Sequence, residues 1–299
     1  MKRTWDQRAS SFARRYLPPA ASKLGKRAAV HLRYRQQLRA ARGGFAERGG
    51  TYPHPIVFIA GLPKSGTTWL KNMVASYPGF HEVMLPEVAS YELATGGSHD
   101  YELPADVFSR LGNALAVMKM HVHGSPHNAA LLEKHEIPYI VLYRDLRDVA
   151  ISYFFYVRQT PWHPDFRRFE SLDLAQGLLR FADYPLREYV GWIESWRCNA
   201  DPRLGLTLRY EDLLRDTAAW LGRVANHFDL DASADTIDRI VAANDFSAMS
   251  GGRGRGEENQ DSFFRKGVSG EWRRRFPADV LAHYQSIIGD YMADLGYDT

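Results

Sequence analysis

Short, continuously apolar runs alternate with longer stretches of helical periodicity from about residue 55 onward, and this alternation constrains the fold most. The apolar runs that predict strands cover 56–60, 115–120, 139–144 and 205–210. The stretches that predict helices cover 67–76, 126–135, 146–157, 172–198, 211–228 and 233–243. Strands that are apolar along their whole length must be buried on both faces, so the pattern predicts an α/β fold, a single domain with a central parallel β-sheet flanked by helices. In such folds ligands bind beyond the carboxyl ends of the strands.

The first 50 residues differ from the rest of the chain in charge. They hold 13 lysines and arginines against two acidic residues, whereas the remainder holds 25 against 33, so the net charge of +3 hides a strongly basic segment. Apolar residues at helical spacing predict two basic amphipathic helices there, separated by "LPP" and closed off by glycine pairs at 43–44 and 49–50. We therefore divide the chain into a basic amphipathic helical N-terminal extension, 1–50, and a main domain, 51–299.

The role of the extension has two readings. It is either a helical arm that packs on its own domain or on a partner subunit, or a segment that lies on an anionic membrane surface. Nucleic acid is not expected as a partner, because the rest of the chain supplies no recognition element. No apolar run approaches the ~20 residues that span a bilayer, and the N-terminus does not read as a secretory signal. With one cysteine, Cys198, and so no disulfide framework, a cytoplasmic location is expected, with peripheral membrane contact through 1–50 left open.

The stretch "AGLPKSGTTWL", residues 60–70, predicts a phosphate-binding loop after the first strand. A strand, a glycine-containing turn and a helix beginning near Thr67 aim backbone N–H groups and the positive end of a helix dipole at one point. In a nucleoside-triphosphate loop the lysine follows the second glycine, but here Lys64 precedes Gly66 and Thr67 stands in the lysine's place. The spacing alone leaves the nucleotide open, and a magnesium-dependent P-loop kinase is the alternative.

Two later segments carry further anion-binding residues. "LYRDLRDVAISYFFY" places Arg144 at the end of a predicted strand and Ser152 in the following helix, an arrangement suited to a second phosphate. "FFRKGVSGEWRRRF", residues 263–276, places Arg265 and Lys266 before Gly267, which has no side chain to keep a ligand from the backbone. The three arginines at 273–275 are expected to form a solvated face. The polar, glycine-rich stretch 250–262 predicts a mobile loop and a candidate lid.

These three segments, in this order, resemble the nucleotide-binding segments of the cytosolic-type sulfotransferases over about residues 53–276. The resemblance implies a P-loop-containing nucleotide-binding fold, with 51–299 as the sulfotransferase domain. It also implies an enzyme that uses 3′-phosphoadenosine 5′-phosphosulfate (PAPS) without a metal and releases adenosine 3′,5′-bisphosphate (PAP). For the 5′-phosphosulfate it implies Lys64, Ser65, Gly66, Thr67 and Thr68. For the 3′-phosphate it implies Arg144, Ser152, Arg265, Lys266 and Gly267, and for the adenine it implies Trp69, Tyr210 and Phe246.

The resemblance also implies the residues of the transfer step. "MKMH", residues 118–121, resembles the family's Lys-x-His segment, with Met120 in place of the usual Thr. Lys119 and Lys64 would neutralise charge on the sulfuryl oxygens, and His121 would act as general base, since an unperturbed histidine has a pKa near 6.5. Glu87 in "MLPEVASYE" is the rival base, because related Golgi-type enzymes place a catalytic glutamate a short way after the phosphosulfate loop.

The acceptor and the assembly are less constrained. A small-molecule or lipid-like acceptor with a hydroxyl is expected. An apolar pocket for it could be formed by Phe80, Tyr91, Phe154, Phe155, Tyr156 and Trp162. The family's dimerisation segment is not matched, because Pro277 and Ala278 stand where Thr and Val are usual, so the oligomeric state stays open.

Overall fold

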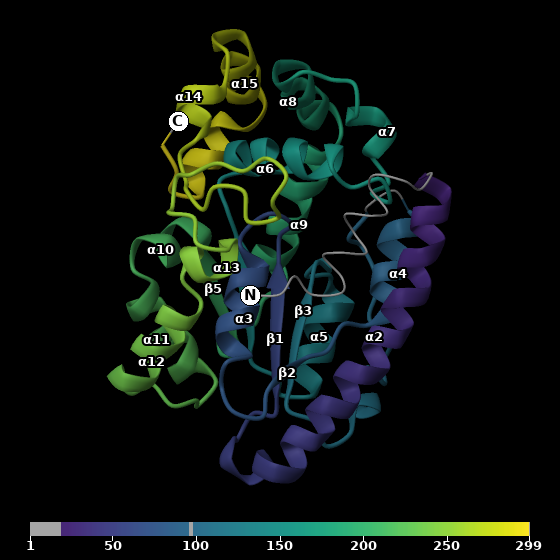
Figure 1. Ribbon diagram of the computed structural model, residues 1–299, viewed down its shortest axis with the longest axis vertical. Coiled ribbons are helices and arrows are strands. Elements are labelled where there is room, and N and C mark those ends of the chain that lie inside the picture. Colours follow the sequence, from purple (N-terminus) through teal and green to yellow (C-terminus); the bar gives the residue numbers. More distant parts are fainter. Residues whose placement is uncertain (1–18, 96–97, 299) are drawn as a thin grey trace.

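The structure is a computed structural model that describes residues 19–95 and 98–298, with side chains described from residue 29 onward. The first of the two expected N-terminal helices lies outside the described residues. Figure 1 shows the overall arrangement, a sheet in the middle with helices on both sides.

The sheet has five strands in the order β2-β3-β1-β4-β5, and every pair of neighbours is parallel. The strands are β1 Ile56–Gly61, β2 His81–Glu82, β3 Ala116–Met120, β4 Tyr139–Tyr143 and β5 Gly205–Arg209. The four predicted strands are present, and the parallel α/β fold is confirmed. The sequence pattern missed β2, which has only two residues and so no periodicity to detect. Since β1 lies between β3 and β4, the loop that follows it opens at the centre of the sheet's carboxyl edge.

Alternate residues of β1 pack on opposite faces of the sheet. Val57 and Ile59 belong to one buried cluster, which helices α3, α11 and α12 cover, whereas Phe58 and Ala60 belong to a second cluster beneath α6, α8 and α9. The principal helices of the domain are α3 Thr67–Val74, α4 Pro86–Ala94, α5 Pro126–Lys134, α6 Leu146–Arg158, α8 Leu174–Asp183, α9 Pro185–Asn199, α10 Tyr210–Arg215, α11 Thr217–His227, α12 Ala234–Ala243 and α15 Ala278–Asp294. The short segments are α7 Phe166–Phe169, α13 Phe246–Ser250, α14 Trp272–Arg275 and the 3₁₀ turns η1 Gly49–Thr51 and η2 Ser109–Leu111.

Two of the expected helices are each divided in two. The stretch 172–198 breaks at Tyr184, because Pro185 begins α9 and has no N–H to continue α8. The stretch 211–228 breaks at Asp216, whose side chain accepts a hydrogen bond from the Ala219 amide and so caps α11. Helices α4 and α15 were not predicted.

Helix α2, Pro19–Arg48, lies along the β2 edge of the sheet and contacts β2 and α4 (Figure 1). Val30 and Ala41 are buried, and Arg33 forms an ion pair with Glu82 of β2. The turn expected at residues 43–44 is wrong, because the helix runs through both glycines. A Cβ atom at Gly44 would lie 2.0 Å from the carbonyl oxygen of Gly79, so this glycine serves close backbone packing. In the part of the chain that the structure describes, no helix has the length and apolarity that crossing a membrane requires.

Candidate active site

A cavity of about 390 Å³ lies beyond the carboxyl ends of the central strands and is lined by residues from all three predicted nucleotide-binding segments. Of the predicted site residues it brings together Lys64, Gly66, Thr67, Thr68, Trp69, Lys119, His121, Arg144, Ser152, Tyr210, Phe246, Arg265, Lys266 and Gly267. Ser65 and Glu87 do not line it. Of the six aromatic residues expected at an acceptor pocket, Tyr156 and Trp162 line the cavity.

The phosphate loop joins β1 to α3 in a conformation that few residues adopt. Lys64 has φ 68° and Gly66 has φ 78°, both in the left-handed region. A Cβ atom at Gly66 would lie 2.6 Å from the ring of Tyr210, so only glycine fits. Ser65 is fully buried, and no described residue makes a hydrogen bond to its hydroxyl oxygen Oγ. A buried hydroxyl without a partner is costly, which indicates a loop shaped for a ligand.

The ammonium of Lys64 is enclosed among other cations. Burial, together with the positive charges of Arg144, Lys119 and Arg265, lowers the pKa of Lys64 to about 7. Its Nζ atom lies 3.8 Å from the centroid of the Tyr156 ring and 5.0 Å from that of Phe263. An anion in the cavity would offset this repulsion, so the site is electrostatically suited to a multiply charged ligand.

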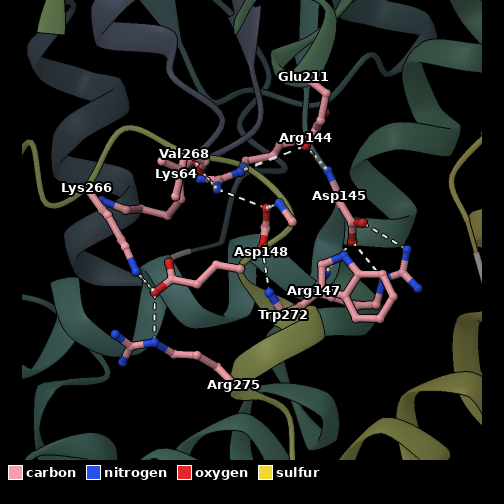
Figure 2. A network of polar contacts seen from close by, with 12 residues as sticks. Lys64, Arg144, Asp145, Arg147, Asp148, Glu211, Lys266, Val268, Trp272 and Arg275 are labelled. Atoms are coloured by element: carbon pink, nitrogen blue, oxygen red, sulfur yellow. Dashed lines mark hydrogen bonds and ion pairs between the residues drawn. The ribbon is translucent and has the colours of Figure 1, made fainter. Parts of the chain in front are cut away.

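Arg144, at the carboxyl end of β4, connects the phosphate loop to the C-terminal segment (Figure 2). Its guanidinium donates hydrogen bonds to the carbonyl oxygens of Lys64 at 3.3 Å and Val268 at 2.8 Å, and it pairs with the Asp148 carboxylate at 3.2 Å. Asp148 in turn accepts the backbone N–H groups of Gly270 at 2.6 Å and Trp272 at 3.0 Å. Arg144 was predicted from its sequence position as a phosphate ligand, and the structure also gives it this structural role.

The basic residues of the C-terminal segment surround a buried carboxylate. Arg265, Lys266 and Arg275 all pair with Glu271, which is 1% exposed, and Arg265 and Arg275 also pair with Glu258. Burial alone would raise the pKa of Glu271, but these cations outweigh it and lower the pKa to about 2. The expectation of a solvated arginine face is therefore wrong for Arg275, whereas Arg273 and Arg274 are exposed.

Aromatic rings line the cavity between the two basic groups. Trp69 and Tyr210 lie edge to face with centroids 6.4 Å apart, and Arg144 stacks 4.5 Å above the Tyr210 ring. A Cβ atom at Gly267, which has φ 69°, would lie 2.4 Å from the Phe246 ring. The cavity thus offers flat apolar faces between cationic ends, an arrangement that fits a purine carrying phosphates at two positions.

Lys119 and His121 lie at the carboxyl end of β3. His121 Nδ1 is 2.5 Å from the Gly61 carbonyl oxygen, which can only accept, so Nδ1 carries the proton and Nε2 accepts from Lys119 Nζ at 3.0 Å. Burial and the charge of Lys119 lower the pKa of His121 well below its ordinary value of 6.5. The imidazole is therefore neutral at pH 7, as a proton acceptor must be.

Glu87 lies in the first turn of α4 and pairs with Arg110 at 2.6 Å. Arg110 is itself partly exposed and also pairs with Asp106. Because Glu87 does not reach the cavity lining, the geometry favours His121 over it as the group beside a reacting hydroxyl.

Sequence reasoning missed the residues at the far end of the cavity. His99, Tyr153, Asp165, Glu188 and Tyr189 line it there. His99 Nδ1 lies 2.8 Å from Glu188 Oε1, and the same oxygen accepts the backbone N–H of His99. The two residues are 89 positions apart with no motif around either, so no local signal could have paired them.

The stretch expected to be a lid contributes to the cavity wall through Arg255, Phe263 and Phe264. Within it, Arg253 donates to the carbonyl oxygens of Glu257 at 3.0 Å and Arg265 at 2.9 Å. One arginine thus fixes the path of a segment without regular secondary structure, and lid motion stays a prediction.

A parallel α/β sheet with a phosphate loop at its centre and a cavity at its carboxyl edge defines a nucleotide-binding P-loop type of protein. The chain belongs to the sulfotransferase family: the model for the Sulfotransferase domain matches residues 54–296. It is therefore an enzyme of the sulfotransferase class, and the resemblance drawn from its three motifs is confirmed.

Similar proteins share most of their length with this chain. It is 24% identical to Sulfotransferase 1E1 of Cavia porcellus over 76% of this chain and 81% of that protein, and 25% identical to Flavonol 3-sulfotransferase of Flaveria bidentis over 81% and 84%. The crystal structure of mouse sulfotransferase SULT7A1 complexed with PAP superposes with a TM-score of 0.60 at 19% identity, covering 80% of this chain and 85% of that one. Retinol dehydratase in complex with androsterone and PAP gives a TM-score of 0.57 at 19% identity, covering 81% and 82%. The structural likenesses confirm the fold.

Proposed function

We propose that this enzyme transfers the sulfuryl group of PAPS to a hydroxyl of a small-molecule acceptor and releases PAP. One observation carries the proposal: the phosphate loop and the Arg265–Lys266 group open into the same cavity, which the rings of Trp69, Tyr210 and Phe246 also line. A nucleotide with phosphates at both its 5′ and 3′ positions needs two such anion sites, whereas ATP needs one. The mouse sulfotransferase with a similar fold was crystallised with PAP, which supports this choice.

The residues present fit PAPS. At the loop, the Ser65 hydroxyl is buried without a described partner, and Thr67 and Thr68 begin α3, where backbone N–H groups point outward. At the other end, Ser152, Arg265, Lys266 and Gly267 line the cavity. The rings of Trp69, Tyr210 and Phe246 line the same cavity and would pack on the adenine in this proposal. When bound, PAPS supplies an activated sulfuryl group whose bond to the 5′-phosphate oxygen breaks as the acceptor oxygen bonds to sulfur.

His121 takes the acceptor's proton at Nε2 in this proposal. The Gly61 carbonyl holds the ring in the tautomer that leaves Nε2 unprotonated. Lys119 lies 3.0 Å from that nitrogen, where its charge can stabilise negative charge on the transferred group. Lys64 is the second cation on this side of the cavity, beside the phosphate loop.

The acceptor of the proposal is a small molecule with a hydroxyl. The relatives' names include a flavonol sulfotransferase, and retinol dehydratase was crystallised with androsterone, so proteins similar to this one take compact ring compounds. Tyr153, Tyr156 and Trp162 line the cavity, and in this proposal they pack against the ring of the acceptor.

Calorimetry with PAP and with ATP–Mg²⁺ tests the donor. PAP is expected to bind at least about tenfold more tightly, since each charge-assisted hydrogen bond contributes about 1.5–3 kcal/mol and the 3′-phosphate adds several. Tighter binding of ATP–Mg²⁺ would favour the P-loop kinase alternative and overturn the proposal.

Turnover with labelled PAPS and 4-ethylphenol tests the base. His121→Ala is expected to lower kcat by about 10²–10⁴-fold with PAP affinity retained, because general bases contribute on that scale. Glu87→Ala is the comparison, expected to keep kcat within about threefold, since Glu87 does not line the cavity. The opposite pattern would assign the base to Glu87.

A further inference from the structure

The acceptor end of the cavity contains a carboxylate and an imidazole bound to each other. His99 is 7% exposed and its Nδ1 lies 2.8 Å from Glu188 Oε1, while the Glu188 side chain is 25% exposed and both residues line the cavity. Among the described residues, no hydrogen-bond partner contacts His99 Nε2 or Glu188 Oε2. When the ring is neutral, Nδ1 donates to Glu188, so Nε2 and Oε2 are both lone-pair acceptors.

This pair contacts His121, the same imidazole that Lys119 contacts. The rings of His99 and His121 meet edge to face with centroids 5.9 Å apart, and Lys119 Nζ contacts His121 on its own Nε2. Lys119, His121, His99 and Glu188 thus form a continuous series of contacts along the cavity wall. A positive charge on the acceptor would be repelled by Lys64 and Lys119 at one end and attracted by Glu188 at the other.

Asp165, another carboxylate of the cavity, is less available to a cation than Glu188 is. Asp165 also lines the cavity, but it is 2% exposed and already accepts hydrogen bonds from Tyr153 and Arg168. Among the described residues, Glu188 pairs with His99 alone, and its partial withdrawal from water strengthens its attraction for a cation.

We propose that His99 and Glu188 form an acceptor-recognition site for a protonated amine, so that the acceptor is an aromatic hydroxyl compound carrying an ammonium group at its opposite end. An ammonium has three N–H donors and can satisfy Nε2 and Oε2 together, whereas a hydroxyl has one proton and satisfies one of them. The acceptor lies with its hydroxyl at His121 and its ammonium at Glu188. This inference rests on the proposed function and names the substrate class of the same site.

Four acceptors of matched shape test the proposal on the full chain: tyramine, tyrosol, 4-ethylphenol and 3-(4-hydroxyphenyl)propionate. They place an ammonium, a hydroxyl, a methyl group or a carboxylate at the same end of a phenol. Labelled PAPS gives kcat/KM for each. The kcat/KM for tyramine is expected to exceed that for 4-ethylphenol at least about tenfold, because a site built to accept from a donor rejects the analogue that lacks that donor. The kcat/KM for the propionate is expected to be the lowest of the four.

Glu188→Gln removes the charge but keeps an oxygen that can accept from His99. It is expected to bring the ratio of kcat/KM for tyramine to that for 4-ethylphenol close to one, mainly by raising the KM for tyramine. Glu194→Gln is the matched control, since Glu194 lies on the same helix and pairs with Arg197 outside the cavity. His99→Asn is the second variant and is expected to reduce the same ratio.

The outcomes separate this inference from the donor assignment. Three results would overturn the acceptor inference and leave the donor assignment intact. They are a tyramine to 4-ethylphenol ratio that Glu188→Gln does not change, equal kcat/KM values for tyrosol and tyramine, and sulfation of none of the four acceptors by an enzyme that still binds PAP. Failure to bind PAP would instead overturn the proposed function. A PAP-dependent rise in melting temperature for each variant shows that it is folded.

Discussion

Lys64 shows how strongly one residue's chemistry depends on its surroundings. Its backbone is in the left-handed region, and it stands before the second glycine of the loop, whereas the lysine of a triphosphate loop follows that glycine. Burial among Arg144, Lys119 and Arg265 lowers its pKa to about 7. The sequence motif located Lys64 correctly in the cavity, but it could not reveal the pKa, because the other cations come from distant segments. The same limit applies to Ser65, whose hydroxyl the sequence placed in the loop but not in a buried position.

PAP binding is expected to take up protons above pH 7. The free enzyme's Lys64 is mostly protonated below pH 7, and the bound anion favours the ammonium, so its pKa rises on binding. Affinity is therefore constant below pH 7 and falls up to about tenfold per pH unit as the pH rises between the free and bound pKa values. Calorimetry at pH 8 in two buffers of different ionisation enthalpy measures the uptake. Equal apparent enthalpies in the two buffers, or the same uptake in Lys64→Met, would contradict this origin.

At the scale of elements, the continuous apolar strands and the local motifs were predictable from the sequence. The breaks within the expected helices 172–198 and 211–228 were not. The four long strands and the three nucleotide-binding segments are each one stretch of chain, so their residues carry the signal together. The two glycines at 43–44 were read as a turn, although Gly44 lies in a helix that packs on Gly79. The His99–Glu188 pair joins a loop to α9 and depends wholly on tertiary packing. Membrane contact through residues 1–50 stays a prediction, and in α2 the apolar residues Val30 and Ala41 face the domain.

Helix α2 is expected to contribute directly to stability. Ala41 is fully buried. Ala41→Asp would therefore bury an unpaired carboxylate and lower the free energy of unfolding by about 3 kcal/mol or more. Ala46→Asp on the same helix, at an exposed position, is the control and is expected to change stability by less than about 0.5 kcal/mol. Urea denaturation compares the two. Equal midpoints would show that α2 does not belong to the cooperative unit.

At the scale of the whole molecule, Asp148 connects the middle of the chain to its C-terminal part. It is 1% exposed and receives Arg144 together with the N–H groups of Gly270 and Trp272. The path of the chain beyond α13 therefore depends on a carboxylate more than 100 residues earlier, a coupling that sequence patterns do not show.

Asp148→Asn is expected to lower the free energy of unfolding by about 3 kcal/mol, since it removes the nearer of the two carboxylates that pair with the buried Arg144 guanidinium and leaves Glu211 at 4.0 Å. For a chain of this size that corresponds to a fall of about 5 °C in melting temperature, measurable by calorimetry. PAP affinity is expected to fall as well, because residues 265–268 lose their anchor. Asp183→Asn, at an exposed position of α8, provides the comparison, and an equal effect of both substitutions would contradict the role of Asp148.

The hydrogen bond from Arg144 to the Val268 carbonyl joins two segments that are synthesised at different times. All five strands have been synthesised by residue 209, yet one wall of the cavity comes from residues 263–268. Residues 297 and 298 also contact two helices of the domain, because Tyr297 donates to Glu211 of α10 and Arg147 of α6 donates to the Asp298 carbonyl. A chain in which the five strands have been synthesised but residues 263–268 have not therefore has the phosphate loop without the opposite wall of the cavity. A nucleotide that contacts both the phosphate loop and residues 263–268 is therefore expected to bind only after these distant segments have folded together.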